Sequence, residues 1–260
     1  MTQAKKWKKP LWITLAVVGA LVLLAVLLGV LNALVGNGEW TFFWSDYRYD
    51  DTGYTVGDGT VYADTLTEID VDWIDGHVEI VVCGDTYPSV SEKISGEVPE
   101  SSRMRFCVSE DGKTLFVKYR APSYFLGKTE NEQKDLTVRI PERMLESMQS
   151  LRLKTVSGSV SAEAIPFDKI SIETSSGALT LAPDARTEEV HLTTKSGDVT
   201  LLFESDPSLS IRYQSGKNDV LLSDFPYEKT EDFYLYGEGK TTINVTSESG
   251  ELTVKKKKQE

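Results

Sequence analysis

The chain has 260 residues, with 40 acidic and 28 basic side chains and a net charge of −12. An acidic surface repels phosphate backbones and anionic lipid headgroups, so this balance excludes a typical nucleic-acid-binding protein. The chain has only two histidines and two cysteines, so few residues are present that could form a zinc site or a Ser-His pair. We therefore expect no catalytic residue, metal or cofactor.

The amino terminus predicts a membrane anchor. Residues 1–10 form a basic segment with four lysines and no acid, and residues 11–35 carry no charge. As a helix, this uncharged segment would extend about 38 Å, enough to cross a bilayer with some tilt. We expect residues 1–10 in the cytoplasm, one retained transmembrane helix, and the rest outside the cell. The alternative is a cleaved secretory signal, but the apolar segment is longer than such signals use and no clean cleavage site follows Ala33.

Residues 36–60 follow as a juxtamembrane linker, aromatic at first and then acidic and Gly-rich. Aromatic rings of this kind suit the membrane-water boundary, where they lie at headgroup level. The alternative is that they cap the open end of the folded domain. The expected membrane-interface residues are Trp40, Phe42, Phe43 and Trp44.

A repeated pattern dominates the remainder of the chain, as in "ISIETSSGALTL" and "VHLTTKSGDVTL". Its glycines, Gly158, Gly177, Gly197 and Gly216, follow one another at steps of 19, 20 and 19 residues, a spacing typical of a structural repeat. One further copy occurs earlier, as "IDVDWIDGHVEI", and another occurs near the end, around Gly250.

Alternating apolar and polar residues predict short strands with one buried face on each side of every Ser-Gly step. We expect the glycine to supply a positive φ and the neighbouring hydroxyls to satisfy turn amides. Two strands and two turns form one coil of about 20 residues, and coils must stack to bury their apolar face. The predicted fold is all-β, a β-solenoid or single-chain β-helix-like stack over residues 61–254, extracellular and preceded by the transmembrane helix.

Less regular strands lie between the first copy and the tandem repeats, in "SVSEKIS", "MRFCVSEDGKTLFVKYR" and "LTVRIP". Residues 142–150 could form a helical turn. Between Gly216 and Gly250 lies an insertion that we expect to project from the stack as a loop or short hairpin and to carry specificity for a partner. Its candidate partner-binding residues are Phe225, Tyr227, Phe233, Tyr234 and Tyr236.

Charged residues and cysteines leave several alternatives open. The stretch "DVDWIDG" misses the calcium-loop pattern by one position, and a solvated strand face is favoured over a calcium site. Cys83 and Cys107 could form a disulfide outside the membrane, or remain two buried thiols. The basic tail of residues 255–260 is either a solubilising end or a contact for wall polymers or headgroups.

The N-terminal anchor, the early "IDVDWIDGHVEI", the central "LTVRIP" and the tandem Ser-Gly strands together resemble the DUF4097 family of bacterial β-strand-repeat proteins, which are candidate adhesins. The resemblance covers nearly the whole ectodomain. It implies a β-solenoid on the bacterial cell surface and suggests a sensing or regulatory role, because members occur among cell-envelope stress proteins. The family offers no agreed catalytic residues to carry over.

Three functions follow as hypotheses. The favoured one is a membrane-anchored, non-enzymatic binding module, either an adhesin or a modulator of cell-envelope stress signalling, whose partner is another envelope protein, a peptide or a wall polymer. The second is a polysaccharide-binding or polysaccharide-cleaving β-helix, which needs exposed aromatics and paired carboxylates. The third is a structural surface element without a specific ligand. The sequence leaves the oligomeric state open.

Overall fold

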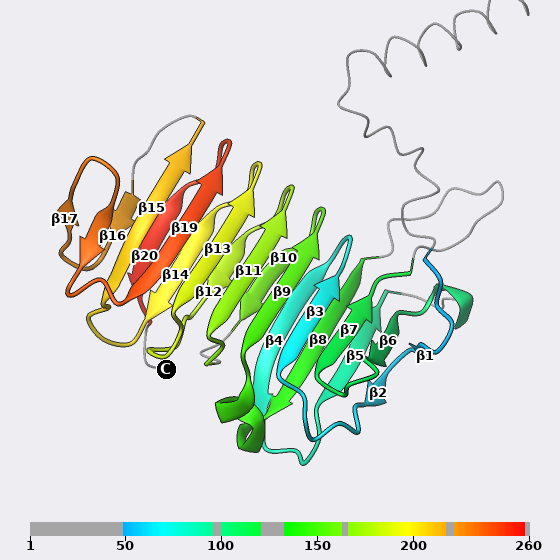
Figure 1. Cartoon of the computed structure of the whole chain (residues 1–260). Helices are drawn as coiled ribbons and strands as arrows, with labels where there is room; N and C mark the ends of the chain where they lie inside the picture. Colours follow the sequence, from blue (N-terminus) through cyan, green and yellow to red (C-terminus); the bar gives the residue numbers. More distant parts are fainter. Residues whose placement is uncertain (1–48, 96–99, 121–132, 163–165, 217–220, 258–260) are drawn as a thin grey trace, which may run out of the picture. The chain divides into compact units, whose positions relative to one another are not determined.

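The computed structural model describes residues 49–95, 100–120, 133–162, 166–216 and 221–257. From Asp50 onward these residues form one compact unit, which is all-β apart from two short 3-10 helices, η1 (Glu100–Ser102) and η2 (Glu142–Ser147). Eleven strands form one sheet and nine form the other. Figure 1 shows the two sheets lying face to face, which is the architecture expected of a β-solenoid.

We call the larger sheet sheet A and the smaller sheet B. In spatial order, sheet A consists of β1 (Thr55–Val56), β6 (Arg105–Val108), β7 (Thr114–Lys118), β3 (Glu68–Asp72), β9 (Ser150–Thr155), β11 (Lys169–Thr174), β13 (Glu189–Thr194), β19 (Thr241–Ser247), β15 (Leu209–Ser215), β18 (Tyr234–Tyr236) and β17 (Glu228–Lys229). Sheet B consists of β16 (Leu221–Ser223), β20 (Leu252–Lys256), β14 (Val199–Phe203), β12 (Leu179–Leu181), β10 (Ser159–Ala162), β4 (His77–Cys83), β8 (Lys134–Pro141), β5 (Ser89–Ile94) and β2 (Gly59–Thr60).

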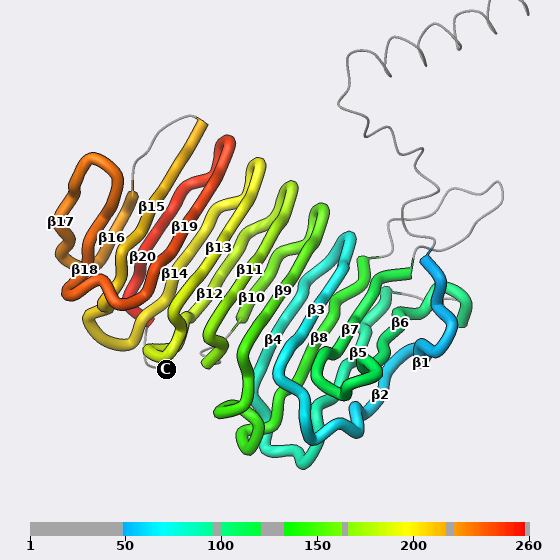
Figure 2. The backbone as a smooth tube through the Cα atoms, in the orientation of Figure 1, coloured from blue at the N-terminus to red at the C-terminus, as the bar shows by residue number. Residues whose placement is uncertain are grey.

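Each repeat forms one coil, as the sequence pattern predicts. A strand in sheet A leads through the Ser-Gly turn to a strand in sheet B, and a return loop brings the chain back (Figure 2). Equivalent strands pair in parallel and in register, so that Ile170 lies beside Leu151 and Ile172 beside Leu153. The apolar side chains of both sheets point inward and are buried. The interior is therefore a packed core of stacked aliphatic rows.

The order of coils in the stack differs from their order in the chain at both ends. The coil of β3 and β4 lies between that of β7 and β8 and that of β9 and β10. The last coil, β19 and β20, lies between the coil of β13 and β14 and the coil of β15 and β16. At each end, therefore, the chain reverses direction along the stack, so that coils distant in sequence become neighbours in space.

Glycine is required at the Ser-Gly turns chiefly because neighbouring turns approach closely. A Cβ atom added at Gly177 would lie 2.2 Å from the carbonyl oxygen of Gly158, and one at Gly250 would lie 2.0 Å from that of Gly197. Only Gly76, with φ of 99°, has the positive φ that we expected of these turns. The expectation is wrong for the other copies, because the stacking of backbones excludes a side chain without requiring a left-handed conformation.

Inward-facing hydroxyls cap the turns at Gly158, Gly197 and Gly250, as predicted, whereas the buried Thr174 hydroxyl at the Gly177 turn has no hydrogen-bond partner among the described residues. The Thr194 hydroxyl accepts a hydrogen bond from the amide of Gly197 at 2.8 Å, and the Ser247 hydroxyl accepts one from Gly250 at 2.7 Å. These side chains are buried, and the bond satisfies an amide that the strand ladder leaves unpaired. The hydroxyl column therefore has a structural role.

The folded unit is longer than residues 61–254. Thr55–Val56 pairs with β6, and Gly59–Thr60 pairs with β5, so the second half of the expected linker belongs to the sheets. At the other end β20 reaches Lys256, which places two of the tail lysines in a strand. The helical turn expected within residues 142–150 is η2.

Several predictions concern residues that the structure does not describe. The basic segment, the transmembrane helix of residues 11–35 and the aromatic residues Trp40, Phe42, Phe43 and Trp44 all lie outside the described residues. Among the residues that are described, no helix has the length and apolar character needed to span a bilayer.

Candidate functional site

The outer face of sheet A carries polar side chains in straight rows, because strands in register align equivalent outward positions. One row runs from Asp70 through Arg152, Ser171 and His191 to Asn244. Opposite charges alternate along parts of this face, and Lys169 pairs with Glu189 at 3.4 Å. The face thus presents a regular grid of hydrogen-bonding groups.

A shallow hollow of about 350 Å³ opens on this grid. The hollow forms because the short side chains of Ser150 and Ser171 lie between longer charged side chains. Burial raises the pKa of Asp70, although the nearby Arg152 guanidinium opposes the shift. Across the hollow, a hydrogen bond from His191 lowers the pKa of Glu189. The lining residues with polar side chains are Glu68, Asp70, Thr114, Ser150, Arg152, Lys169, Ser171, Glu189 and His191.

Sheet B places His77 between two serines. Its Nδ1 lies 2.8 Å from the hydroxyl oxygen of Ser159, and its Nε2 lies 2.8 Å from that of Ser161. No sequence pattern indicates this group, because the serines are more than 80 positions from His77 and meet it only when β4 pairs with β10. The carboxylate of Asp135 accepts a hydrogen bond from the backbone amide of His77. That carboxylate is therefore bound to the backbone and does not orient the imidazole as in a catalytic triad.

A cleft of about 420 Å³ lies at the edge of the stack, between the return loops after β12 and β14. It forms where the loop after β14 passes over the interposed coil of β19 and β20 to reach β15. Lys257 lines the cleft, and its amide donates to the carbonyl oxygen of Phe203 at 2.8 Å. The side chain of Lys257 lies 3.6 Å from the Glu204 carboxylate. The first residue after β20 is thereby held against this cleft.

The described part of the insertion expected to bind a partner forms a short hairpin, as predicted, and this hairpin joins the edge of sheet A as a cap. Its strand β18 pairs antiparallel with β15, and β17 pairs with β18. Phe225, Tyr234 and Tyr236 are buried, Phe233 is half-buried, and Tyr227 is 41% exposed. Burial raises the pKa of Tyr236 to about 12. Three of the five candidate partner-binding residues thus close the end of the core, because large rings gain more from burial than from exposure.

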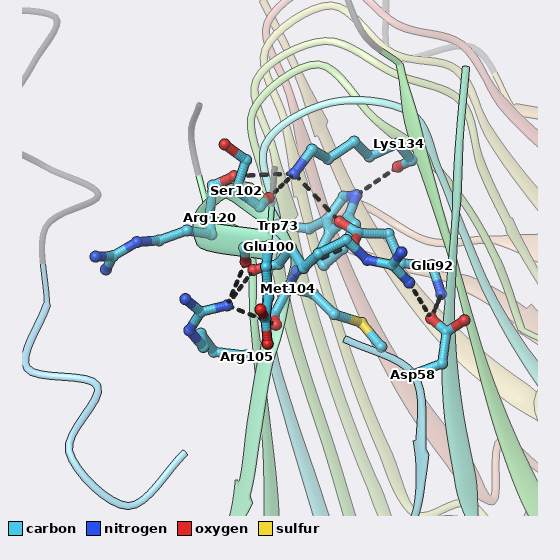
Figure 3. A network of polar contacts seen from close by, with 10 residues as sticks. Asp58, Trp73, Glu92, Glu100, Ser102, Met104, Arg105, Arg120 and Lys134 are labelled. Carbon is cyan, nitrogen blue, oxygen red and sulfur yellow. Dashed lines mark hydrogen bonds and ion pairs between the residues drawn. The ribbon is translucent and has the colours of Figure 1, made fainter. Parts of the chain in front are cut away.

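The opposite end of the stack is closed by charged residues (Figure 3). Lys134, at the start of β8, has a fully buried side chain, and its Nζ lies 3.3 Å from Oε1 of the equally buried Glu92 on β5. The same ammonium donates to the carbonyl oxygens of Ser102 and, at 3.0 Å, of Arg120. It also lies 4.7 Å from the centre of the Tyr119 ring.

This network continues to the surface on the other side of Glu92. Its Oε2 accepts a hydrogen bond from the amide of Met104 at 3.0 Å and lies 3.3 Å from Arg103 Nε. Arg103 in turn pairs with Asp58 at 3.2 Å. The charges alternate in sign and link sheet B to the segment that leads into β6 of sheet A. Because each buried charge has an opposite partner, the network serves to hold the two sheets together at this end.

The two cysteines are free thiols. Cys83 lies at the end of β4 in sheet B, and Cys107 lies on β6 in sheet A. Of the two alternatives, a disulfide or separate thiols, the structure has separate thiols. Both are partly buried, and burial raises the pKa of the Cys83 thiol. A raised pKa lowers the thiolate fraction at neutral pH and hence the reactivity of this side chain.

Within the described ranges, no group of three histidine, cysteine, aspartate or glutamate side chains is arranged to hold a metal ion. The "DVDWIDG" stretch forms part of β3 and its turn. Asp70 and Asp72 lie on the outer face of β3, as the alternation predicts, and burial raises the pKa of both.

Comparison with known proteins identifies the fold. The family model described as Toastrack DUF4097 matches residues 66–260. The crystal structure of a candidate cell adhesion protein from Clostridium sporogenes ATCC 15579 superimposes with a TM-score of 0.61 at 14% identity, covering 78% of this chain and 100% of that chain. A candidate adhesin from Bacteroides fragilis NCTC 9343 gives a TM-score of 0.32 at 13% identity, covering 78% of this chain and 97% of that one. No protein in the curated set matches the chain.

Proposed function

Because the chain belongs to the Toastrack DUF4097 family, we propose that it is a membrane-anchored cell-surface protein whose β-solenoid is a non-enzymatic binding module. In this proposal residues 1–10 remain in the cytoplasm, residues 11–35 span the membrane and the solenoid faces outward. The charge distribution supports this orientation, since all basic residues before Arg48 precede the apolar segment. The module acts as an adhesin or as a modulator of envelope-stress signalling.

The arrangement of polar side chains on the outer sheet faces is the observation that carries this proposal. The interior is filled by aliphatic rows, so ligands must bind on the outside. There the strands display rows of charged and hydroxyl groups at the regular spacing of a β-sheet, and on sheet A these rows include the hollow. Such a rigid, extended surface suits the recognition of a partner, as in other repeat proteins.

The charge of the ectodomain restricts the partners. Removing the four N-terminal lysines from the net charge of −12 leaves −16 on the part that we place outside the cell. Binding to nucleic acids or other strongly anionic polymers is therefore disfavoured. An envelope protein, a peptide or a weakly charged wall polymer fits this surface better.

Photocrosslinking on intact cells tests the proposal. A photoreactive residue is placed either at Ser171, in the hollow of sheet A, or at Thr180, on the opposite face of the same coil. We expect one position to capture a defined envelope component, identified by mass spectrometry, and the other to capture much less. Equal, background-level capture from both faces, together with loss of the protein from the membrane fraction, would contradict a surface binding module.

A second function, polysaccharide cleavage, is favoured by one observation. Glu68 and Asp70 line the same hollow from alternate positions of β3, and burial raises the pKa of Asp70. Side chains at alternate positions of a strand are about 7 Å apart, within the range at which two carboxylates can divide the roles of general acid and base. Reducing-end release from isolated wall polysaccharide distinguishes the two functions. The binding module predicts no release, whereas release that disappears in Asp70→Asn would support the enzyme.

A further inference from the structure

An exposed tyrosine on the edge of the solenoid stands out from the other apolar surface. Tyr62 is 80% exposed. Among the large hydrophobic residues that the structure describes, Leu222 is next, at 50%. Val61 and Leu66, on either side of Tyr62 in the sequence, are buried in the core. The chain is therefore anchored on both sides of Tyr62, and the core gains nothing from the position of its ring.

Tyr62 is part of a fixed group of four side chains, which we call the edge cluster: Tyr62, Asp64, Tyr87 and Arg143. The rings of Tyr62 and Tyr87 have their centres 5.2 Å apart and meet edge to face, at 63°. The guanidinium carbon of Arg143 lies 5.4 Å from the centre of the Tyr87 ring. Three segments that are distant in sequence thus meet at this point.

Hydrogen bonds hold the edge cluster in place. Arg143 donates from Nε to the carbonyl oxygen of Thr86 at 2.6 Å and from Nη2 to the Asp64 carboxylate at 2.7 Å. The segment that carries Tyr62 is held by a hydrogen bond of 2.8 Å, which the Val61 amide donates to the carbonyl oxygen of Pro88. A binding surface fixed in advance loses less conformational entropy when it takes up a ligand.

Polar groups of the edge cluster remain accessible beside the exposed ring. The side chains of Arg143 and Asp64 are 44% and 67% exposed, although they contact each other. A guanidinium has five N–H donors and a carboxylate has several acceptor sites, so the pair keeps hydrogen-bonding capacity after forming its own contacts. An apolar ring plane thus lies next to both a donor and an acceptor.

We propose that the edge cluster is a binding site for a neutral, pyranose-containing glycan. An aromatic ring offers a flat apolar surface for the C–H face of a pyranose, and a charged donor and acceptor beside it can bind adjacent sugar hydroxyls. The surplus of acids on the ectodomain disfavours a polyanionic glycan. This inference rests on the proposed function, because it names one class of ligand for the binding module and adds a binding position at its edge to those on the sheet faces.

Binding of defined oligosaccharides to the full chain tests the proposal. The protein is reconstituted in nanodiscs, since sugar-based detergents would compete for the site. Saturation-transfer NMR titrations use cellotetraose and chitotetraose as neutral probes and tetragalacturonate as the anionic control. We expect at least one neutral probe to bind and tetragalacturonate to bind at least tenfold more weakly.

Variants assign the binding to the edge cluster. Tyr62→Ala should weaken binding at least tenfold, whereas Tyr62→Phe, which keeps the ring, should remain within threefold of the wild type. Leu222→Ala, at an exposed apolar side chain outside the edge cluster, is the control and should bind like the wild type. Because Tyr62 is exposed, we expect its variants to keep the wild-type thermal midpoint.

Three outcomes would overturn the proposal: no binding of either neutral probe, equal binding by Tyr62→Ala, or tighter binding of tetragalacturonate. Retention of the same proteins on isolated cell envelopes separates this failure from that of the proposed function. If the oligosaccharides do not bind but wild-type protein is retained, the binding module stands and its ligand is a different envelope component, such as a protein. If neither binding is seen, both proposals fail.

Discussion

The two ends of the solenoid are closed in different ways. At the end near β5 and β6, a fully buried ion pair between Lys134 and Glu92 joins the two sheets. At the end near β17 and β18, the rings of Tyr227, Tyr234 and Tyr236 cover the core. Both ends also place antiparallel strands on the outermost parallel strand of sheet A.

The two ends differ in how far their stability depends on individual side chains. A buried charge is stable only while its partner is present, so the ionic end depends on every member of the network. An aromatic cap gains its stability from area, and loss of one polar atom changes little. The ionic end should therefore respond sharply to single substitutions, and the aromatic end should respond mainly to loss of a ring.

The largest expected effect is at the ionic end. Lys134→Met removes the fully buried cation beside Glu92 and leaves Arg103 as the cation that contacts this carboxylate, and we expect a loss of about 3–5 kcal/mol in the free energy of unfolding. Urea denaturation at pH 7 measures it. The double variant Lys134→Met/Glu92→Leu removes both charges and should recover much of the loss. A single variant within about 1 kcal/mol of wild type would show that the ion pair does not close this end.

A substitution in the body of the stack provides the reference for both ends. Gly177→Ala would place a Cβ atom 2.2 Å from the carbonyl oxygen of Gly158, so neighbouring backbones must separate. We expect a loss of about 1–3 kcal/mol, as for overpacked cores, again by urea denaturation. Gly84→Ala is the matched control, because no atom lies within 4 Å of its added Cβ. Equal stability of the two variants would contradict the close stacking of the turns.

The aromatic end predicts a dependence on alkaline pH. The pKa of Tyr236 is about 12 in the folded chain, above the ordinary value of 10, so its contribution to stability is complete below pH 10 and is lost as pH rises toward 12. Tyr236→Phe keeps the ring and should differ from wild type by less than about 1 kcal/mol at pH 7. Between pH 10 and 12 the variant should lose less stability than the wild type. Parallel curves across this range would contradict the burial of the hydroxyl.

The smallest expected effect is an acid response at the ionic end. Arg105 donates to the Asp51 carboxylate at 3.1 Å and lowers its pKa. A lowered pKa means that the contribution of Asp51 to stability is present above its unfolded value and is lost as pH falls through the folded value. Asp51→Asn should therefore have a slightly lower thermal midpoint than wild type at pH 7, and this gap should close at pH 2. A gap that persists in acid would show that the contact does not depend on charge.

The sequence does not predict which side chains meet in the candidate sites, because these contacts form only when strands distant in sequence pair. The insertion aromatics were identified as a group, but their burial depends on the antiparallel pairing of β18 with β15. The contact of His77 with two serines and the edge cluster both join residues from distant segments. Alternation along a strand indicates which face a residue occupies, but it does not indicate which strand lies beside it.

The sequence alone determined the repeat, the two strands of each coil, the inward-facing residues and the column of turn glycines. These features are local, because a period of about 20 residues and a two-residue alternation specify each coil independently. Only the tertiary structure decided the order of the coils, with β19 and β20 placed between earlier neighbours, and the way in which each end is closed. The edges of similar coils can pair with one another in more than one order. The order of the coils therefore depends on the irregular segments at the two ends, whose partners are distant in sequence.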